Sequence, residues 1–187
     1  MPGLQRIILI NCHLPGFVEL DVSGHSNICG TNASGKTTLQ RLIPVFYGEL
    51  PSKVVPKTRK KFDDFYLPHA NSYLIYEYQR EDGQNCQVVL TRKGSDGVQY
   101  RFVEAPYHQE QILVVTEQDK VLDNSKNNVQ AMLPEQWIKQ LRQLGIHFSH
   151  KIQATSEFRS VIQNDVSVGR GAGRENTKLR QLASRYS

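Results

Sequence analysis

The sequence has few cysteines and no long apolar run, and both shortages exclude classes of protein. Cys12, Cys29 and Cys86 lie far apart without the paired spacing of a zinc site or a disulfide framework, so we expect reduced, structural cysteines. The longest apolar fragments, such as RIILI and QILVVT, are far shorter than the roughly 18 residues of a membrane span. The start of the chain also lacks the layout of a signal peptide. These absences predict a cytoplasmic chain with no membrane segment.

Composition and charge indicate a globular chain with an anionic partner. With 187 residues the chain can form one large domain or two small ones, and its 39% of hydrophobic residues excludes a disordered chain. The formal charge is +5, and positive residues gather in residues 51–61 and 169–185. Such runs contact phosphates in nucleic-acid-binding proteins. They are also typical of solvated loops and helix faces, so both interpretations stay open.

The first quarter of the chain alternates strand-like and helix-like patterns. Short apolar or alternating runs predict strands at residues 4–12, 17–22 and 25–30. From Thr37 onward, apolar residues recur at helical spacing, which predicts a helix packed on a sheet. Because Pro44 lies within this pattern, we expect a kink or an early end of the helix there.

The middle of the chain predicts an antiparallel β-meander at about residues 71–116. It follows residues 48–70, which are rich in Pro, Lys and aromatic residues and predict an irregular excursion. Asp82-Gly83 and Asp96-Gly97 join the β-rich runs, and glycine tolerates the positive φ that tight hairpin turns need. The predicted strands of the meander are 71–79, 85–93, 98–104 and the run ILVVT.

The last third is predicted to be helical and then basic. Residues 133–145, LPEQWIKQLRQLG, have a proline near the first turn and a glycine after the last, which is typical of a helix. SEFRSVIQND predicts a second short helix with Ser156 as its N-cap, so the helical part covers about residues 133–163. Residues 169–187 form a basic tail, in which NTKLRQLASRY is a candidate start of a coiled coil.

The loop Gly30–Thr37, GTNASGKT, fits the phosphate-binding pattern G-x-x-x-x-G-K-[ST]. Its backbone N–H groups would converge on phosphate oxygens, and the following helix would add its positive N-terminal end. Lys36 would contact the β- and γ-phosphates, and the Thr37 hydroxyl would bind Mg²⁺. A chance match in a chain of this length has a probability of roughly 0.6% at ordinary residue frequencies. The pattern therefore predicts a nucleotide site, the alternative being a glycine-rich turn with an unrelated lysine.

Residues 6–43, RIILINCHLPGFVELDVSGHSNICGTNASGKTTLQRLI, resemble the N-terminal head segment of the SMC and RecF/RecN-like ABC ATPases, in which a strand pair precedes a GxNGxGK[ST][ST] loop. MukB-like and other bacterial SMC-like proteins, some of them from anti-phage defence systems, look most similar. The resemblance implies an α/β P-loop NTPase fold of the ABC/SMC head type, whose N-terminal lobe joins a mixed sheet to the antiparallel meander. It assigns this lobe to residues 1–168 and implies ATP and Mg²⁺ as cofactors.

The resemblance also implies roles for single residues of the loop. Lys36 matches the phosphate lysine, and Thr37 matches the magnesium-binding hydroxyl. Ala33 stands where the family usually has glycine, so the loop must accommodate a methyl group. The remaining nucleotide-binding positions of the family correspond to Gly30, Asn32, Ser34, Gly35 and Thr38.

The resemblance implies roles for residues at two further places outside the loop. Gln163 falls where the family has a Q-loop glutamine that completes the Mg²⁺ shell, with Gln153 as a competitor and an ordinary surface glutamine as the alternative. Asn11 and His13 fall near where such heads place a polar or basic residue against the nucleotide. A turn histidine with no role in binding is the alternative for His13.

The sequence shows neither a Walker B carboxylate pair nor an LSGGQ-like signature, which such heads need for hydrolysis. Glu117, in ILVVTEQD, imitates a Walker B acid but comes one residue late. In SMC-like proteins both motifs lie in a C-terminal half-head beyond a long coiled coil. The resemblance therefore implies an N-terminal half-head that binds ATP weakly and hydrolyses almost none alone. Its implied partners are its own C-terminal half, a second head across the ATP in a homodimer, and DNA.

Three functional hypotheses follow. The leading one is an ATPase module whose ATP-driven head engagement acts on DNA, in chromosome maintenance, repair or anti-phage defence, in the cytoplasm or at the nucleoid. The second is a self-contained P-loop NTPase or kinase that uses Glu117 as its carboxylate. The third is a nucleotide-gated protein-interaction module without DNA contact.

Overall fold

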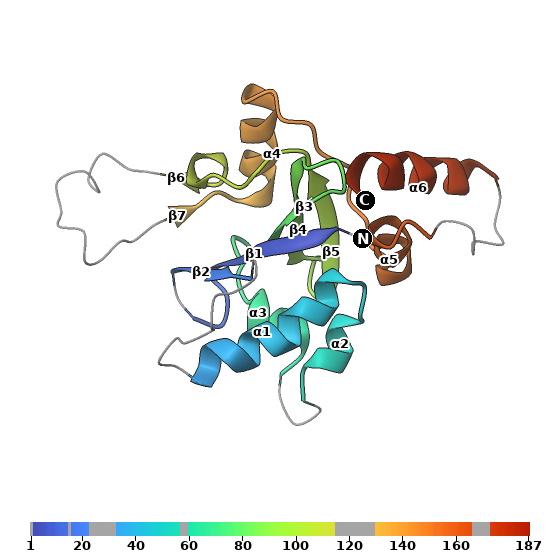
Figure 1. Ribbon diagram of the computed structural model, residues 1–187. Coiled ribbons are helices and arrows are strands. Elements are labelled where there is room, and N and C mark those ends of the chain that lie inside the picture. The colour runs from blue at the N-terminus through green and yellow to red at the C-terminus, as the bar shows by residue number, and fades with distance from the viewer. Residues whose placement is uncertain (1, 15, 23–32, 57–59, 115–129, 166–172) are drawn as a thin grey trace.

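β-Branched and aromatic residues dominate five runs of the chain, and these runs form one antiparallel sheet in the computed structural model (Figure 1). The strands are β1 (Gly3–Ile10), β2 (Phe17–Asp21), β3 (Tyr73–Gln79), β4 (Asn85–Arg92) and β5 (Val98–Val103), in the spatial order β2-β1-β3-β4-β5. The structure describes residues 2–14, 16–22, 33–56, 60–114, 130–165 and 173–187. The expected strand at residues 25–30 lies outside these residues.

All pairings within this sheet are antiparallel, which corrects the expected mixed sheet for the described part of the chain. Short turns that reverse the chain account for the antiparallel pairing within β1–β2 and within β3–β4–β5, whereas the β1–β3 pairing joins strands that are far apart in sequence. Gly83 and Gly97 have φ of 86° and 98°, as the predicted hairpin turns require. The two parts meet where β1 pairs with β3, from Gly3↔Gln79 to Ile10↔Tyr73.

Alternating side chains of the strands divide the core into two layers. On β3, Leu74, Tyr76 and Tyr78 lie in one apolar cluster, whereas Tyr73 and Ile75 lie in the other. The first layer is covered by α1 (Ala33–Phe46), α3 (Phe62–Tyr66), α5 (Thr155–Ile162) and α6 (Gly173–Tyr186), with α2 (Pro51–Val54) beside α1. The second is covered by α4 (Pro134–Gln143) with η1 (Gln109–Gln111) and a ribbon of β6 (Leu113–Val114) and β7 (Gln130–Ala131) (Figure 1).

Several elements differ in detail from the sequence-based expectation. Helix α1 continues past Pro44 to Phe46, so the proline does not end it. Strand β6 pairs with β7 instead of extending the meander. Ser156 is not the N-cap of α5, because the helix begins at Thr155, whose hydroxyl lies 3.0 Å from the Tyr100 hydroxyl.

The last two helices dock on the meander through aromatic stacking. The Phe158 ring of α5 stacks on Tyr100 at a centroid distance of 4.4 Å, and the Tyr186 ring of α6 stacks on Phe102 at 5.0 Å. Both helical aromatic residues are fully buried. The Tyr78 hydroxyl also donates a hydrogen bond to the Tyr186 carbonyl. One side of α6, in the described part of the basic tail, thus packs on the core of the fold.

The turn after α1 is held against α5. Gly48 has φ of 95°, and a Cβ added there would lie 2.6 Å from Cγ of Arg159. Arg159 Nε donates a 2.8 Å hydrogen bond to the Gly48 carbonyl. Only glycine combines this backbone conformation with such a close approach. The turn therefore fixes the distance between α1 and α5.

We expect Gly48→Ala to lower the free energy of unfolding by at least about 2 kcal/mol, because it adds a steric clash to an unfavourable φ. Gly83→Ala is the matched control, since Gly83 has a similar φ of 86° but no atom within 4 Å of an added Cβ. Its expected cost is about 1 kcal/mol. Urea unfolding of both variants measures the difference, and equal losses would contradict the packing argument.

Candidate nucleotide site

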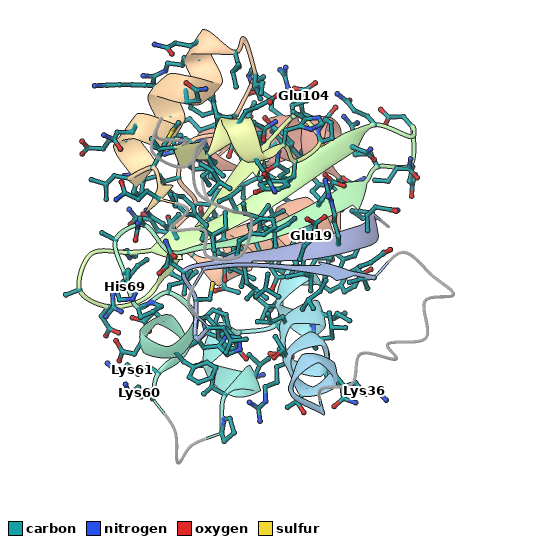
Figure 2. All side chains as sticks on the ribbon, turned by 90° about the vertical axis from the view of Figure 1, so that its left-hand side faces the viewer. Glu19, Lys36, Lys60, Lys61, His69 and Glu104 are labelled. Carbon is teal, nitrogen blue, oxygen red and sulfur yellow. The ribbon has the colours of Figure 1, made fainter. Side chains whose placement is uncertain are left out.

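The candidate nucleotide site lies at the beginning of α1. This helix starts at Ala33, so the second half of the phosphate-loop sequence forms its first turn. Lys36 and Thr37 are exposed there, and the side chain of Thr38 is largely buried. Figure 2 shows Lys36 at the N-terminal end of α1, on the far side from Lys60, Lys61 and His69.

The electrostatics of this end favour an anion. The first turn of α1 contains no acidic residue, so no carboxylate of that turn offsets the partial positive charge of the helix N-terminus. Exposed backbone N–H groups at such an end bind phosphate oxygens. Lys36 adds a full positive charge within the same turn.

The remainder of α1 is anchored in the core. Leu39, Leu42, Val45 and Phe46 are at most 2% exposed. The buried Tyr76 hydroxyl of β3 donates a 2.8 Å hydrogen bond to the Leu42 carbonyl. This bond lies in the turn of the helix that includes Pro44, which has no backbone N–H to donate. The helix is therefore fixed on the sheet, while Lys36 and Thr37 near its start are exposed.

The other positions of the loop are described only in part. Ala33, Ser34 and Gly35 lie in the first turn of α1. Gly30 and Asn32 lie outside the described residues. Their contacts with a nucleotide therefore stay a prediction.

The structure does not bring Gln163 to Thr37. Gln163 follows α5, and its Nε2 donates a 2.8 Å hydrogen bond to the Tyr47 carbonyl at the C-terminal end of α1. Ten residues of helix separate Thr37 from Tyr47, which corresponds to about 15 Å along the axis. In this arrangement Gln163 caps the far end of the helix, and its role as a magnesium ligand stays a prediction.

Asn11 and His13 lie in the turn after β1. The Asn11 side chain donates to the Asn71 carbonyl at 3.4 Å. The His13 ring stacks on Phe65 at 4.9 Å and meets Tyr66 edge-on, and its buried Nδ1 has no hydrogen-bond partner among the described residues. Burial lowers the pKa of His13, so its ring is neutral at pH 7. A contact of His13 with a nucleotide stays a prediction.

Metal ligands do not gather within the described part of the chain. Glu117 lies outside that part, as does Cys29. Cys12 and Cys86 are buried free thiols, and burial raises the pKa of Cys12 to about 12. No group of three His, Cys, Asp or Glu side chains among the described residues could hold a metal ion. None of the described helices has the length and apolarity to cross a membrane.

The fold and the site define an α/β protein in which a helix that begins in a phosphate-loop sequence packs on an antiparallel sheet. The chain belongs to the family described as protein of unknown function DUF3584, whose model matches residues 8–187. Comparison with curated proteins gives no match.

The residues that the sequence reasoning missed are those that hold α1 in place. Arg159 and Tyr76 reach the helix from α5 and β3, at distances of 111 and 34 residues along the chain. No local pattern marks such contacts, because each depends on how distant elements pack. Gly48 is the residue whose type indicates the end of α1 in the sequence, because glycine is common directly after a helix.

We expect Gln163→Ala to lower the free energy of unfolding by about 0.5 to 1 kcal/mol, because it removes one partly exposed hydrogen bond to the Tyr47 carbonyl. Magnesium-dependent ATP affinity should not change. Gln153→Ala is the matched control, since Gln153 is an exposed glutamine that competes for the same sequence-based role. Urea unfolding and ATP titration with and without Mg²⁺ measure both quantities. A loss of magnesium dependence with unchanged stability would instead assign Gln163 to the metal.

Proposed function

We propose that the chain binds Mg-ATP through residues 30–37 and serves as the N-terminal segment of an SMC-like ATPase head. The observation that carries this proposal is the position of Lys36 and Thr37. They lie exposed on the first turn of a helix whose following residues are buried in the core. A fixed helix presents its N-terminal dipole and the Lys36 charge to phosphates without reorganisation on binding.

Within this proposal each group has a defined task. The N–H groups of the loop and the Lys36 ammonium hold the phosphates, and the Thr37 hydroxyl binds Mg²⁺. A carboxylate that activates water would come from the C-terminal half of the head, and a signature loop from a second head. ATP would then stabilise the engaged pair, and hydrolysis would release it.

DNA is the proposed partner of the engaged heads. Its support is the formal charge of +5 and the two basic segments, 51–61 and 169–185. Exposed Lys60 on the first and Lys178 on the second are not engaged in an ion pair within the described part of the chain. Both are available for contact with DNA phosphates.

We expect Lys36→Ala to weaken ATP binding by about 10- to 100-fold, because it removes a charge-assisted contact to the phosphates. Lys60→Ala is the matched control, since it removes an exposed lysine far from the start of α1. Calorimetric titration of ATP in the presence of Mg²⁺ measures both variants. The same preparation should show almost no phosphate release. Equal affinity of the wild type and Lys36→Ala, or brisk turnover that Lys36→Ala abolishes, would refute the half-site proposal.

Binding of duplex DNA by the protein should weaken steeply with salt. The logarithm of affinity is expected to fall with the logarithm of salt concentration by about 0.9 for each phosphate contacted. Fluorescence anisotropy of a labelled duplex, at several salt concentrations and with ATP present, measures the slope. A flat dependence would remove DNA from the proposal and leave a nucleotide-gated protein-interaction module.

A further inference from the structure

A second cationic site lies on the sheet face opposite α1. It is a pocket of about 340 Å³ between the β4–β5 edge, helix α4 and the segment after it. On the strands, Thr91 and Gln99 form a pair, with Gln99 Nε2 donating 3.0 Å to the Thr91 hydroxyl. Pro134, Trp137 and Ile138 give the pocket an apolar wall on the α4 side. Its size lies within the range of small-molecule sites.

Four cations from three separate segments line this pocket. Arg101 comes from β5, Lys139 and Arg142 from α4, and Lys151 from the segment that runs beside β5. Glu135 is the single carboxylate among the lining residues. Within the described part of the chain, none of the four cations forms an ion pair. Positive charges therefore outnumber negative ones among the described residues that line the pocket.

The geometry holds two of these cations close together. The guanidinium carbons of Arg101 and Arg142 lie 5.5 and 5.6 Å from the centre of the same Phe148 ring. Arg101 is half-buried, and its Nη1 donates a 2.7 Å hydrogen bond to the Ser149 carbonyl. Burial, and then the Arg142 charge, lower the pKa of the Arg101 guanidinium, which nonetheless stays charged. Such a cluster costs folding free energy unless an anion compensates it.

We propose that this pocket binds a small polyanion that carries phosphoryl groups. Four cations against one carboxylate match a multiply charged phosphate better than a single carboxylate. Arginine guanidinium groups recognise phosphoryl oxygens in a bidentate geometry, and the lysines add point charges. The cations surround a recess instead of following a track across the surface, which fits a small ligand rather than a nucleic-acid backbone.

The pocket is separate from the proposed nucleotide site. Trp137 belongs to the apolar cluster under α4, whereas Leu39 and Leu42 of α1 belong to the cluster on the other face of the sheet. Figure 1 shows α4 and α1 on opposite sides of the strands. A ligand in the pocket would therefore leave the phosphate loop accessible, and the two sites can be tested independently.

Pyrophosphate binding to the Lys36→Ala chain tests the proposal, because this background removes the lysine of the phosphate loop. Calorimetry gives the affinity, and fluorescence reports on the pocket itself, since Trp137 is the single tryptophan of the sequence. We expect saturable binding with a change in Trp137 emission. Arg142→Gln or Lys139→Gln should each weaken binding about tenfold, whereas Arg142→Lys, which keeps the charge but loses the bidentate geometry, should weaken it less.

Lys178→Gln, an exposed lysine of α6, is the control for the loss of one positive charge, and it should leave the affinity unchanged. Thermal unfolding followed by circular dichroism verifies that each variant is folded. The proposal is overturned if millimolar pyrophosphate produces no saturable signal, or if Arg142→Gln and Lys139→Gln bind as tightly as their parent. A response to duplex DNA with none to pyrophosphate would also overturn it.

Discussion

The burial of one side of α1 against the sheet is the constraint on which the rest of the structure depends. Leu39, Leu42 and Val45 are essentially inaccessible to solvent. Since side chains three and four positions apart share one side of a helix, their burial fixes the rotation of α1 about its axis. That rotation decides which residues of the first turn face solvent. Thr38, four positions before Leu42, is buried on this side of the helix, whereas Lys36 and Thr37 are exposed.

The two ends of α1 are treated differently by the fold. The first turn at the N-terminal end contains no acidic residue, whereas the C-terminal end is covered by α5. There the Arg159 guanidinium and the Gln163 amide donate to the last carbonyls, a position at which a positive charge is favourable. Because α5 packs on α6 and on the meander, the orientation of the helix is set by elements more than 100 residues away in sequence. These contacts hold α1 in one orientation on the sheet.

The sequence was sufficient for features that depend on neighbouring residues. The five strands, both hairpin turns and the helix at 133–145 follow from periodicity and turn chemistry, and the structure confirms them. Pro44 does not end α1, because the cost of its missing backbone donor is small beside the burial of Val45 and Phe46. No local sequence pattern indicates that the strand in ILVVT pairs with a strand beyond residue 129. For the candidate site, the sequence predicts a phosphate loop at residues 30–37, but the position of Gln163 depends on the packing of α5 on α1, which no motif encodes.

The distribution of positive charge in the structure also differs from what the sequence alone indicates. The basic run at residues 51–61 is conspicuous in the sequence, yet Lys53 and Lys61 are paired with Glu49 and Asp96 in the structure. The cations around the α4 pocket form no run, because they come from a strand, a helix and a connecting segment. Exposed pairs contribute little stability but do neutralise charge, so the conspicuous run is weaker as an anion site than its sequence suggests. Where an anion binds this protein therefore depends on which cations the fold leaves without a carboxylate.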